Sequence, residues 1–246
     1  MVRYKAIIAY DGTNFNGFQR QNNGRTIQEE LEKTISKMAS QPIKVHGSGR
    51  TDAGVHALGQ VIHFDFPYER PLERMRFALD TQSPEDIAVK NVEIVTEKFH
   101  ARYLVKEKVY EFHVDIGTPK NPFTRNYASY YPYQLDFDKI KKALPDFLGT
   151  HDFTSFCASG SSIDDKTRTI YEATMQVSHS GNELIFTFRG DGFLYKMIRI
   201  MVGTLLKIGN GRLETDSIPK IIAAKDRHFA GPTAHPQGLY LKEVRY

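Results

Sequence analysis

The sequence predicts an α+β protein with two related subdomains, each built on a mainly antiparallel sheet flanked by helices. Strand-like and helix-like segments alternate along both halves of the 246 residues. Neither half carries the glycine-rich fingerprint of a parallel nucleotide-binding fold. Because the two groups of segments part near residues 103–107, we expect an N-terminal subdomain at 1–105 and a C-terminal subdomain at 106–246.

The first half opens with a strand and a capped helix. The stretch from Val2 to Tyr10 predicts a strand, and the turn-prone residues 11–17 end it. Thr26 begins a T-x-x-E capping box, and apolar residues at helical spacing continue the helix to about Ser40. Further along this half, the patterns predict a strand beginning at 43–46, a strand over 60–66, a helix over 71–80 and a short strand over 92–96.

The second half contains a long apolar helix, predicted from Phe193 to Ile208. One stripe of this helix is largely basic, and it consists of Lys196, Arg199, Gly203 and Lys207. The other elements expected in this half are a strand over 108–116, a helix over 136–148 that Pro145 disturbs near its end, a hairpin of strands 167–179 and 183–189, a helix over 218–224 and a closing strand over 239–246.

Composition narrows the class of protein. Hydrophobic residues make up 40% of the chain and charged residues 25%, so the chain can bury a core. No apolar run approaches the roughly 18–20 residues of a membrane span, and we expect neither a membrane protein nor a secretory signal. The single cysteine, Cys157, excludes an internal disulfide and favours a reducing cytoplasm. A net charge of +4 permits an anionic partner without requiring one.

Several stretches look like known functional motifs but lack a residue that the corresponding chemistry requires. Residues 10–13 look like an aspartate-nucleophile phosphatase motif, but that reaction needs a carboxylate where this chain has Ala9. Residues 47–52 begin like a dinucleotide loop, but Asp52 would repel a pyrophosphate. The nine histidines form no recognised metal motif, and Cys157 has no evident partner base. We therefore expect no metal, no dinucleotide bound at this loop and an inert buried thiol.

The loop at residues 47–56 is the most unusual stretch of the chain. Glycines at three of its first eight positions permit positive φ and close approach of a ligand. Between them lie a cation, a hydroxyl and a carboxylate, which are Arg50, Thr51 and Asp52. On these residues alone, a functional loop and a tight connection with an internal Arg50–Asp52 pair both stay open.

Residues 48–56, Ser-Gly-Arg-Thr-Asp-Ala-Gly-Val-His, resemble the signature loop of the TruA family of tRNA pseudouridine synthases. The resemblance runs from about residue 3 to the C-terminus. Its other motifs are Tyr10-Asp11-Gly12, Gly17-Phe18-Gln19-Arg20-Gln21, Gly59-Gln60-Val61 with Phe64, Phe99-His100-Ala101-Arg102, Asp152-Phe153-Thr154-Ser155-Phe156, Met197-x-Arg199-x-x-Val202-Gly203, Ala223-Ala224-Lys225-Asp226-Arg227 and Gly238-Leu239-Tyr240-Leu241.

The resemblance implies the pseudouridine synthase fold and an isomerase that needs no cofactor. Its reaction would convert uridine to pseudouridine at positions 38, 39 and 40 of the tRNA anticodon stem-loop, in the cytoplasm and as a homodimer. Asp52 matches the family's nucleophile. A carboxylate can attack the ribose or the uracil ring, or stabilise charge at C1′, and the sequence leaves these alternatives open.

Four other residues take roles from the resemblance. Tyr110 matches the tyrosine that stacks on the target base and helps to remove the C5 proton, whereas its sequence alone also fits a strand tyrosine facing the core. Arg50 matches the arginine that replaces the extruded nucleotide. Leu239 matches an apolar residue of the pocket wall, which overlaps with plain core packing.

The position of Arg199 in the predicted helix also points to a specific role. A guanidinium in the middle of an apolar helix needs a partner or a route to water. The resemblance implies that Asp52 is the partner, and the alternative is a solvated cationic stripe that contacts phosphate.

Two functions from different classes follow. The first is a cofactor-free pseudouridine synthase, and the second is a non-catalytic RNA-binding module on the same scaffold. The presence of Asp52 together with Tyr110 and Arg199 favours the enzyme, because a module that only binds RNA gains nothing from a carboxylate facing phosphates.

Overall fold

The computed structural model describes residues 1–160 and 163–246, which form two compact units. The first unit comprises Met1–Lys106 together with Tyr240–Tyr246, and the second comprises Glu107–Leu239. Each unit combines a sheet with helices, so the predicted α+β class with mainly antiparallel sheets is confirmed.

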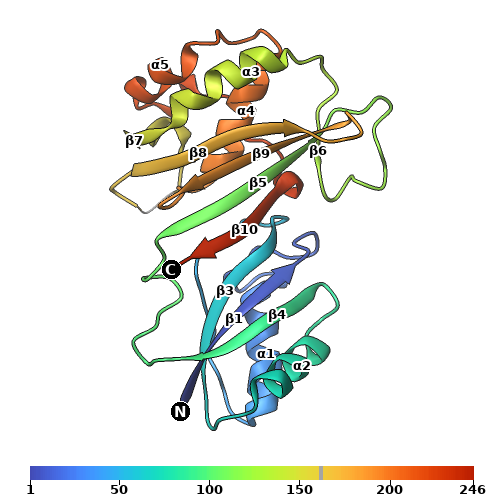
Figure 1. Ribbon diagram of the computed structural model, residues 1–246, viewed down its shortest axis with the longest axis vertical. Coiled ribbons are helices and arrows are strands. Elements are labelled where there is room, and N and C mark those ends of the chain that lie inside the picture. The colour runs from blue at the N-terminus through green and yellow to red at the C-terminus, as the bar shows by residue number, and fades with distance from the viewer. Residues whose placement is uncertain (161–162) are drawn as a thin grey trace. The chain divides into compact units, whose positions relative to one another are not determined.

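The sheet of the first unit is built around two long strands. β1 (Val2–Tyr10) pairs antiparallel with β3 (His56–Phe66) on one side and with β4 (Ile87–Val95) on the other. The short strand β2 (His46–Gly47) also pairs antiparallel with β3, whereas β10 (Leu239–Arg245) pairs with it in parallel through Tyr240 and Leu241. The beginning of β10 therefore lies beside the beginning of β3 (Figure 1).

Helix α1 (Ile27–Ala39) forms where the sequence predicts it. The Thr26 hydroxyl accepts the backbone N–H of Glu29, and Ser40 ends the helix in the left-handed conformation. One face of α1 buries Ile27, Leu31 and Ile35. A second helix, α2 (Leu72–Gln82), contacts α1 and packs against β4 (Figure 1).

The sheet of the second unit has the strand order β5 (Glu107–Asp115), β9 (Glu183–Gly190), β8 (Thr167–Val177) and β7 (Gly149–Asp152), and these neighbours are antiparallel. The two-residue strand β6 (Ser129–Tyr130) pairs with β5 in parallel. The cross-strand pair Phe112 and Phe186 is fully buried and lies in the core of this unit.

Helices of the second unit gather over one face of its sheet (Figure 1). They are α3 (Phe137–Ala143), α4 (Met197–Gly209) and α5 (Ser217–Ala224), with 3₁₀ turns at Leu144–Phe147, Thr154–Phe156, Arg227–Phe229 and Pro236–Gly238. Pro145 lies in the first of these turns, so α3 ends earlier than the expected 148. No helix in the described part of the chain is long and apolar enough to cross a membrane.

Helix α4 begins four residues later than predicted, and this changes the meaning of its basic stripe. Lys196 adopts a left-handed conformation with φ +59° and caps the helix rather than belonging to it. Gly203 is buried, and a Cβ atom there would lie 1.8 Å from the carbonyl oxygen of Pro232. The stripe predicted from Lys196 to Lys207 is therefore interrupted, because the backbone at Pro232 covers its middle.

The close approach at Gly203 supports a stability prediction. Alanine favours a helix interior over glycine by about 1 kcal/mol, so propensity alone would make Gly203→Ala stabilising. We expect the opposite, a loss of about 1–3 kcal/mol in the free energy of unfolding, because the new methyl group must displace the Pro232 backbone. Urea unfolding measures this change.

Gly192→Ala is the control for this prediction. Its Cβ would meet only the Arg168 side chain, at 3.5 Å, so we expect a change within about 0.5 kcal/mol. Equal stabilities for the two alanine variants would contradict the packing that the structure shows at Gly203.

Candidate active site

The loop that carries Asp52 connects β2 to β3 as a tight turn. The backbone N–H of Val55 donates to the carbonyl oxygen of Asp52 at 3.1 Å, and Gly54 takes a φ of +75°. Asp52 is half-buried and Arg50 is exposed. The turn therefore presents a carboxylate and a guanidinium from positions two residues apart.

The segment after β1 lies directly on this loop. A Cβ atom at Gly12 would lie 2.0 Å from the carbonyl oxygen of Val55, and one at Gly17 would lie 2.6 Å from that of Thr51. The N–H of Phe18 donates to the same Thr51 carbonyl at 3.1 Å. Only glycine permits backbone contact this close, which explains the two glycines of the segment.

Side chains from β1 and β3 hold the loop by hydrogen bonds. The hydroxyls of Thr51 and Tyr10 lie 2.8 Å apart and are buried, and burial raises the pKa of Tyr10 to about 12, so its hydroxyl stays protonated at neutral pH. The Ser48 hydroxyl donates to the side chain of Gln60 at 2.6 Å, and Gln60 in turn donates to the carbonyl of Gly49. The residue immediately before Asp52 is thus fixed to β1.

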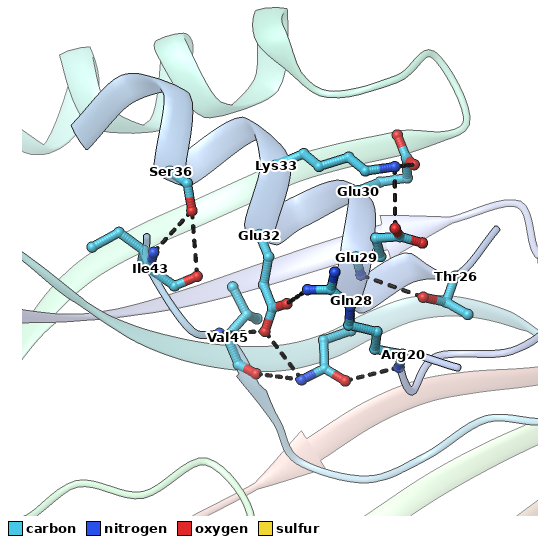
Figure 2. A network of polar contacts seen from close by, with 10 residues as sticks. All are labelled: Arg20, Thr26, Gln28, Glu29, Glu30, Glu32, Lys33, Ser36, Ile43 and Val45. Carbon is cyan, nitrogen blue, oxygen red and sulfur yellow. Dashed lines mark hydrogen bonds and ion pairs between the residues drawn. The ribbon is translucent and has the colours of Figure 1, made fainter. Parts of the chain in front are cut away.

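Helix α1 holds the segment that leads to the loop and the segment that precedes the helix itself (Figure 2). The side chain of Gln28 donates to the carbonyl of Val45, and Glu32 accepts the Val45 N–H at 3.1 Å. Gln28 also accepts the N–H of Arg20, whose guanidinium pairs with Glu32 at 3.2 Å. Val45 directly precedes β2, so this network fixes the entrance to the loop.

In the second unit, Tyr110 lies on β5 with 8% of its surface exposed. Its ring meets that of Phe193 edge to face, with centroids 5.1 Å apart. Phe193 belongs to the connection between β9 and α4, where the sequence predicts helix. The aromatic pair fixes the orientation of the tyrosine ring.

Arg199 lies on α4, half-buried, and binds a segment from near the C-terminus. Its Nε donates to the carbonyl of Ala234 at 2.7 Å, and the Ala234 N–H donates back to the Arg199 carbonyl at 3.0 Å. The Arg227 guanidinium binds the same segment, at Ala230 and Thr233. Leu239, buried to 7% exposure, follows five residues after Ala234.

The predicted site residues thus fall into two groups. The first unit holds Asp52 and Arg50 in one loop, and the second unit holds Tyr110, Arg199 and Leu239. Sequence reasoning missed the supporting contacts, including Tyr10 with Thr51 and Arg199 with Ala234. Their partners are far apart in the chain, and the only sequence signal was the position of Tyr10 at the end of a strand.

No group of three or more His, Cys, Asp or Glu residues in the described ranges could hold a metal ion. Cys157 is buried, as predicted. Its depth fits a thiol that takes no part in chemistry.

Comparisons with known proteins agree along the whole chain. A family described as tRNA pseudouridine synthase matches residues 6–104 and 143–246. The tRNA pseudouridine synthase A proteins of Streptococcus gordonii and Streptococcus mutans are each 60% identical to this chain, and that of Streptococcus sanguinis is 59% identical. Each alignment covers 100% of this chain and 99% of the relative. A chain of a solved Cbf5-Nop10-Gar1 complex overlaps 83% of this chain and 54% of its own length, with 14% identity and a TM-score of 0.37.

Proposed function

Because the chain belongs to the tRNA pseudouridine synthase family, we propose that it isomerises uridine to pseudouridine at positions 38, 39 and 40 of the tRNA anticodon stem-loop. The observation that carries the proposal is the fixed Asp52 turn. A half-buried carboxylate on a loop anchored at Thr51 and Gly12 is preorganised for chemistry. An RNA-binding module would have no use for it.

The reaction leaves the composition of the nucleoside unchanged. The bond between uracil N1 and ribose C1′ breaks, a bond between C5 and C1′ forms, and the proton at C5 leaves while N1 gains one. Asp52 supplies the carboxylate, and attack on C1′ and attack on the uracil ring both remain consistent with its position. No oxidant, reductant or second substrate is required by this balance.

The other residues support this step in the proposal. Tyr110 stacks on the target base and assists removal of the C5 proton. Arg199 stabilises the Asp52 carboxylate by its opposite charge and orients it. Arg50 fills the space of the extruded nucleotide, and Leu239 forms part of the apolar wall. We further propose that the protein acts in the cytoplasm as a homodimer.

Release of tritium from tRNA labelled at uridine C5 tests the proposed function. We expect stoichiometric release at the target uridines without any added cofactor. Binding of the same tRNA with no release would instead establish the RNA-binding module.

Affinity for tRNA should fall steeply as salt rises, because lysine and arginine contacts release counterions from the phosphates. Lys196 is a candidate contact, since it caps α4 with its ammonium 4.7 Å from the ring of the exposed Tyr195. Lys196→Gln should reduce the slope of log K against log salt by about 1. Filter binding over a salt series measures the slope.

Lys33→Gln is the matched control. The Lys33 ammonium already pairs with Glu29 and Glu30 on α1, so its removal should leave the slope unchanged. If both variants show the wild-type slope, Lys196 is not a phosphate contact.

A further inference from the structure

His56 is the residue that ends the Asp52 loop and begins β3. Its side chain is 2% exposed, and its ring stacks on Tyr240 of β10 with centroids 4.7 Å apart and planes inclined by 23°. A buried imidazole at the end of the loop is a polar group that the proposed reaction does not itself require. Its hydrogen bonds indicate a structural role beside the loop.

The backbone N–H of Gly12 donates to Nδ1 of His56 at 3.0 Å. A Gly12 N–H that donates to Nδ1 assigns the ring proton to Nε2. A carboxylate oxygen of Asp11 lies 3.2 Å from the same Nδ1 and accepts hydrogen bonds from the backbone N–H and the hydroxyl of Thr13. The ring thus acts as an acceptor toward the segment after β1.

Gly12 is also the residue at which that segment touches the loop. The space for a Cβ atom at Gly12 is occupied by the carbonyl of Val55, and Val55 closes the turn with Asp52. One hydrogen bond, donated by the Gly12 N–H to His56, therefore fixes the backbone against which the Asp52 turn rests. Without the acceptor, the buried Gly12 N–H would lose its partner, and the segment would move to find another.

We propose that His56 is a positioning residue for the nucleophile, acting through Gly12 as a neutral hydrogen-bond acceptor. The inference rests on the proposed function, because it assigns His56 to the same reaction. It differs from ordinary core packing in a testable way. The nitrogen acceptor, rather than the ring, is what the Asp52 turn depends on.

The chain provides a close control in His63, seven residues further along β3. Its side chain is also 2% exposed and stacks on His46 with centroids 4.8 Å apart. Its Nδ1 accepts a backbone N–H as well, that of Ala101 at 3.1 Å. Burial lowers the pKa of His63 to about 4, so its ring is neutral at pH 7. The two histidines share strand, burial and hydrogen-bond type, but the partner of His63 is not in contact with the Asp52 turn.

The experiment compares single-turnover tritium release at saturating enzyme for the wild type, His56→Phe, His56→Asn and His63→Phe. Phenylalanine keeps the ring and removes the acceptor, whereas the Oδ1 of asparagine lies near the position of Nδ1. We expect His56→Phe to slow release about 10- to 100-fold, the range set by leaving one buried donor unsatisfied, with tRNA affinity within about 3-fold of wild type. His56→Asn should recover most of the rate. His63→Phe should lose about as much stability to urea as His56→Phe, but its rate of release should stay within about 3-fold of the wild-type rate.

Two results would overturn the proposal: a His56→Phe rate no lower than that of His63→Phe, or a His56→Asn rate as low as that of His56→Phe. If His56→Phe does not fold, NMR of the wild type decides, because a proton on Nδ1 of His56 or rapid hydrogen exchange of the Gly12 amide would each exclude the hydrogen bond. An inactive wild type would instead refute the proposed function, and the NMR measurement would still report on the contact.

Discussion

Asp52→Asn is expected to abolish turnover while leaving tRNA affinity largely intact. The amide has nearly the shape of the carboxylate but is a far poorer nucleophile, so we expect a loss of more than about 1,000-fold in single-turnover rate. The turn itself should persist, because it depends on the backbone carbonyl of Asp52 and on the hydroxyl of Thr51. Tritium release and filter binding on the same preparation measure both quantities.

Asp65→Asn is the control for loss of a carboxylate in the same unit. Asp65 pairs with Arg3, at the end of β1 opposite Tyr10, so its removal should affect stability rather than rate. Substantial isomerisation by Asp52→Asn would remove Asp52 from the role of nucleophile, whatever its effect on binding.

Arg199→Met should also lose most activity, by about 100-fold or more, with a smaller effect on tRNA affinity. Methionine keeps much of the side-chain volume but removes the charge that we propose stabilises the Asp52 carboxylate. Lysine at the same position restores the charge without the planar fork, so Arg199→Lys should have an intermediate rate. Single-turnover rates for the two variants, with tRNA affinities, test this order.

The hydrogen bond from Arg199 to Ala234 requires a control, because methionine also releases that segment. Arg227→Met does so as well, since Arg227 binds Ala230 and Thr233. We expect Arg227→Met to lower stability comparably and to slow the reaction much less. If Arg199→Met keeps the wild-type rate and only weakens binding, Arg199 is a phosphate contact and its proposed role beside Asp52 is wrong.

Local signals predicted much of the fold. The capping box at Thr26 and the apolar spacing after it predicted α1 within a residue, because every determinant lies inside the helix. The hairpin of β8 and β9 was equally clear from its alternation and its Ser-Gly-Asn turn. In contrast, α4 was extended too far because Phe193 and Leu194 continue the apolar pattern, and nothing in the pattern reveals the left-handed Lys196.

Long-range contacts lay beyond this kind of reasoning. The closing strand was predicted at 239–246, but its parallel pairing with His56 and Ala57 joins residues from opposite ends of the chain. β4 begins at Ile87 rather than 92 because its first residues pair with the end of β1. The short strands β6 and β7 were missed, since two to four residues carry too little pattern.

The candidate site shows the same division. The composition of the 47–56 loop drew attention to Arg50 and Asp52, and the resemblance to a known family predicted roles for both and for Tyr110, Arg199 and Leu239. The contacts that hold the loop, such as Tyr10 with Thr51 and Gly12 with His56, depend on β1 and β3 lying side by side. The sequence predicts which groups carry the chemistry, and the fold shows the contacts that hold the Asp52 loop.

Nucleoside analysis of tRNA incubated with the purified protein shows whether the isomerisation takes place. We expect pseudouridine in place of uridine at positions 38, 39 and 40, with no change in RNA mass and no added cofactor, and no pseudouridine with Asp52→Asn. Unchanged uridine in tRNA that the wild-type protein binds would contradict this expectation.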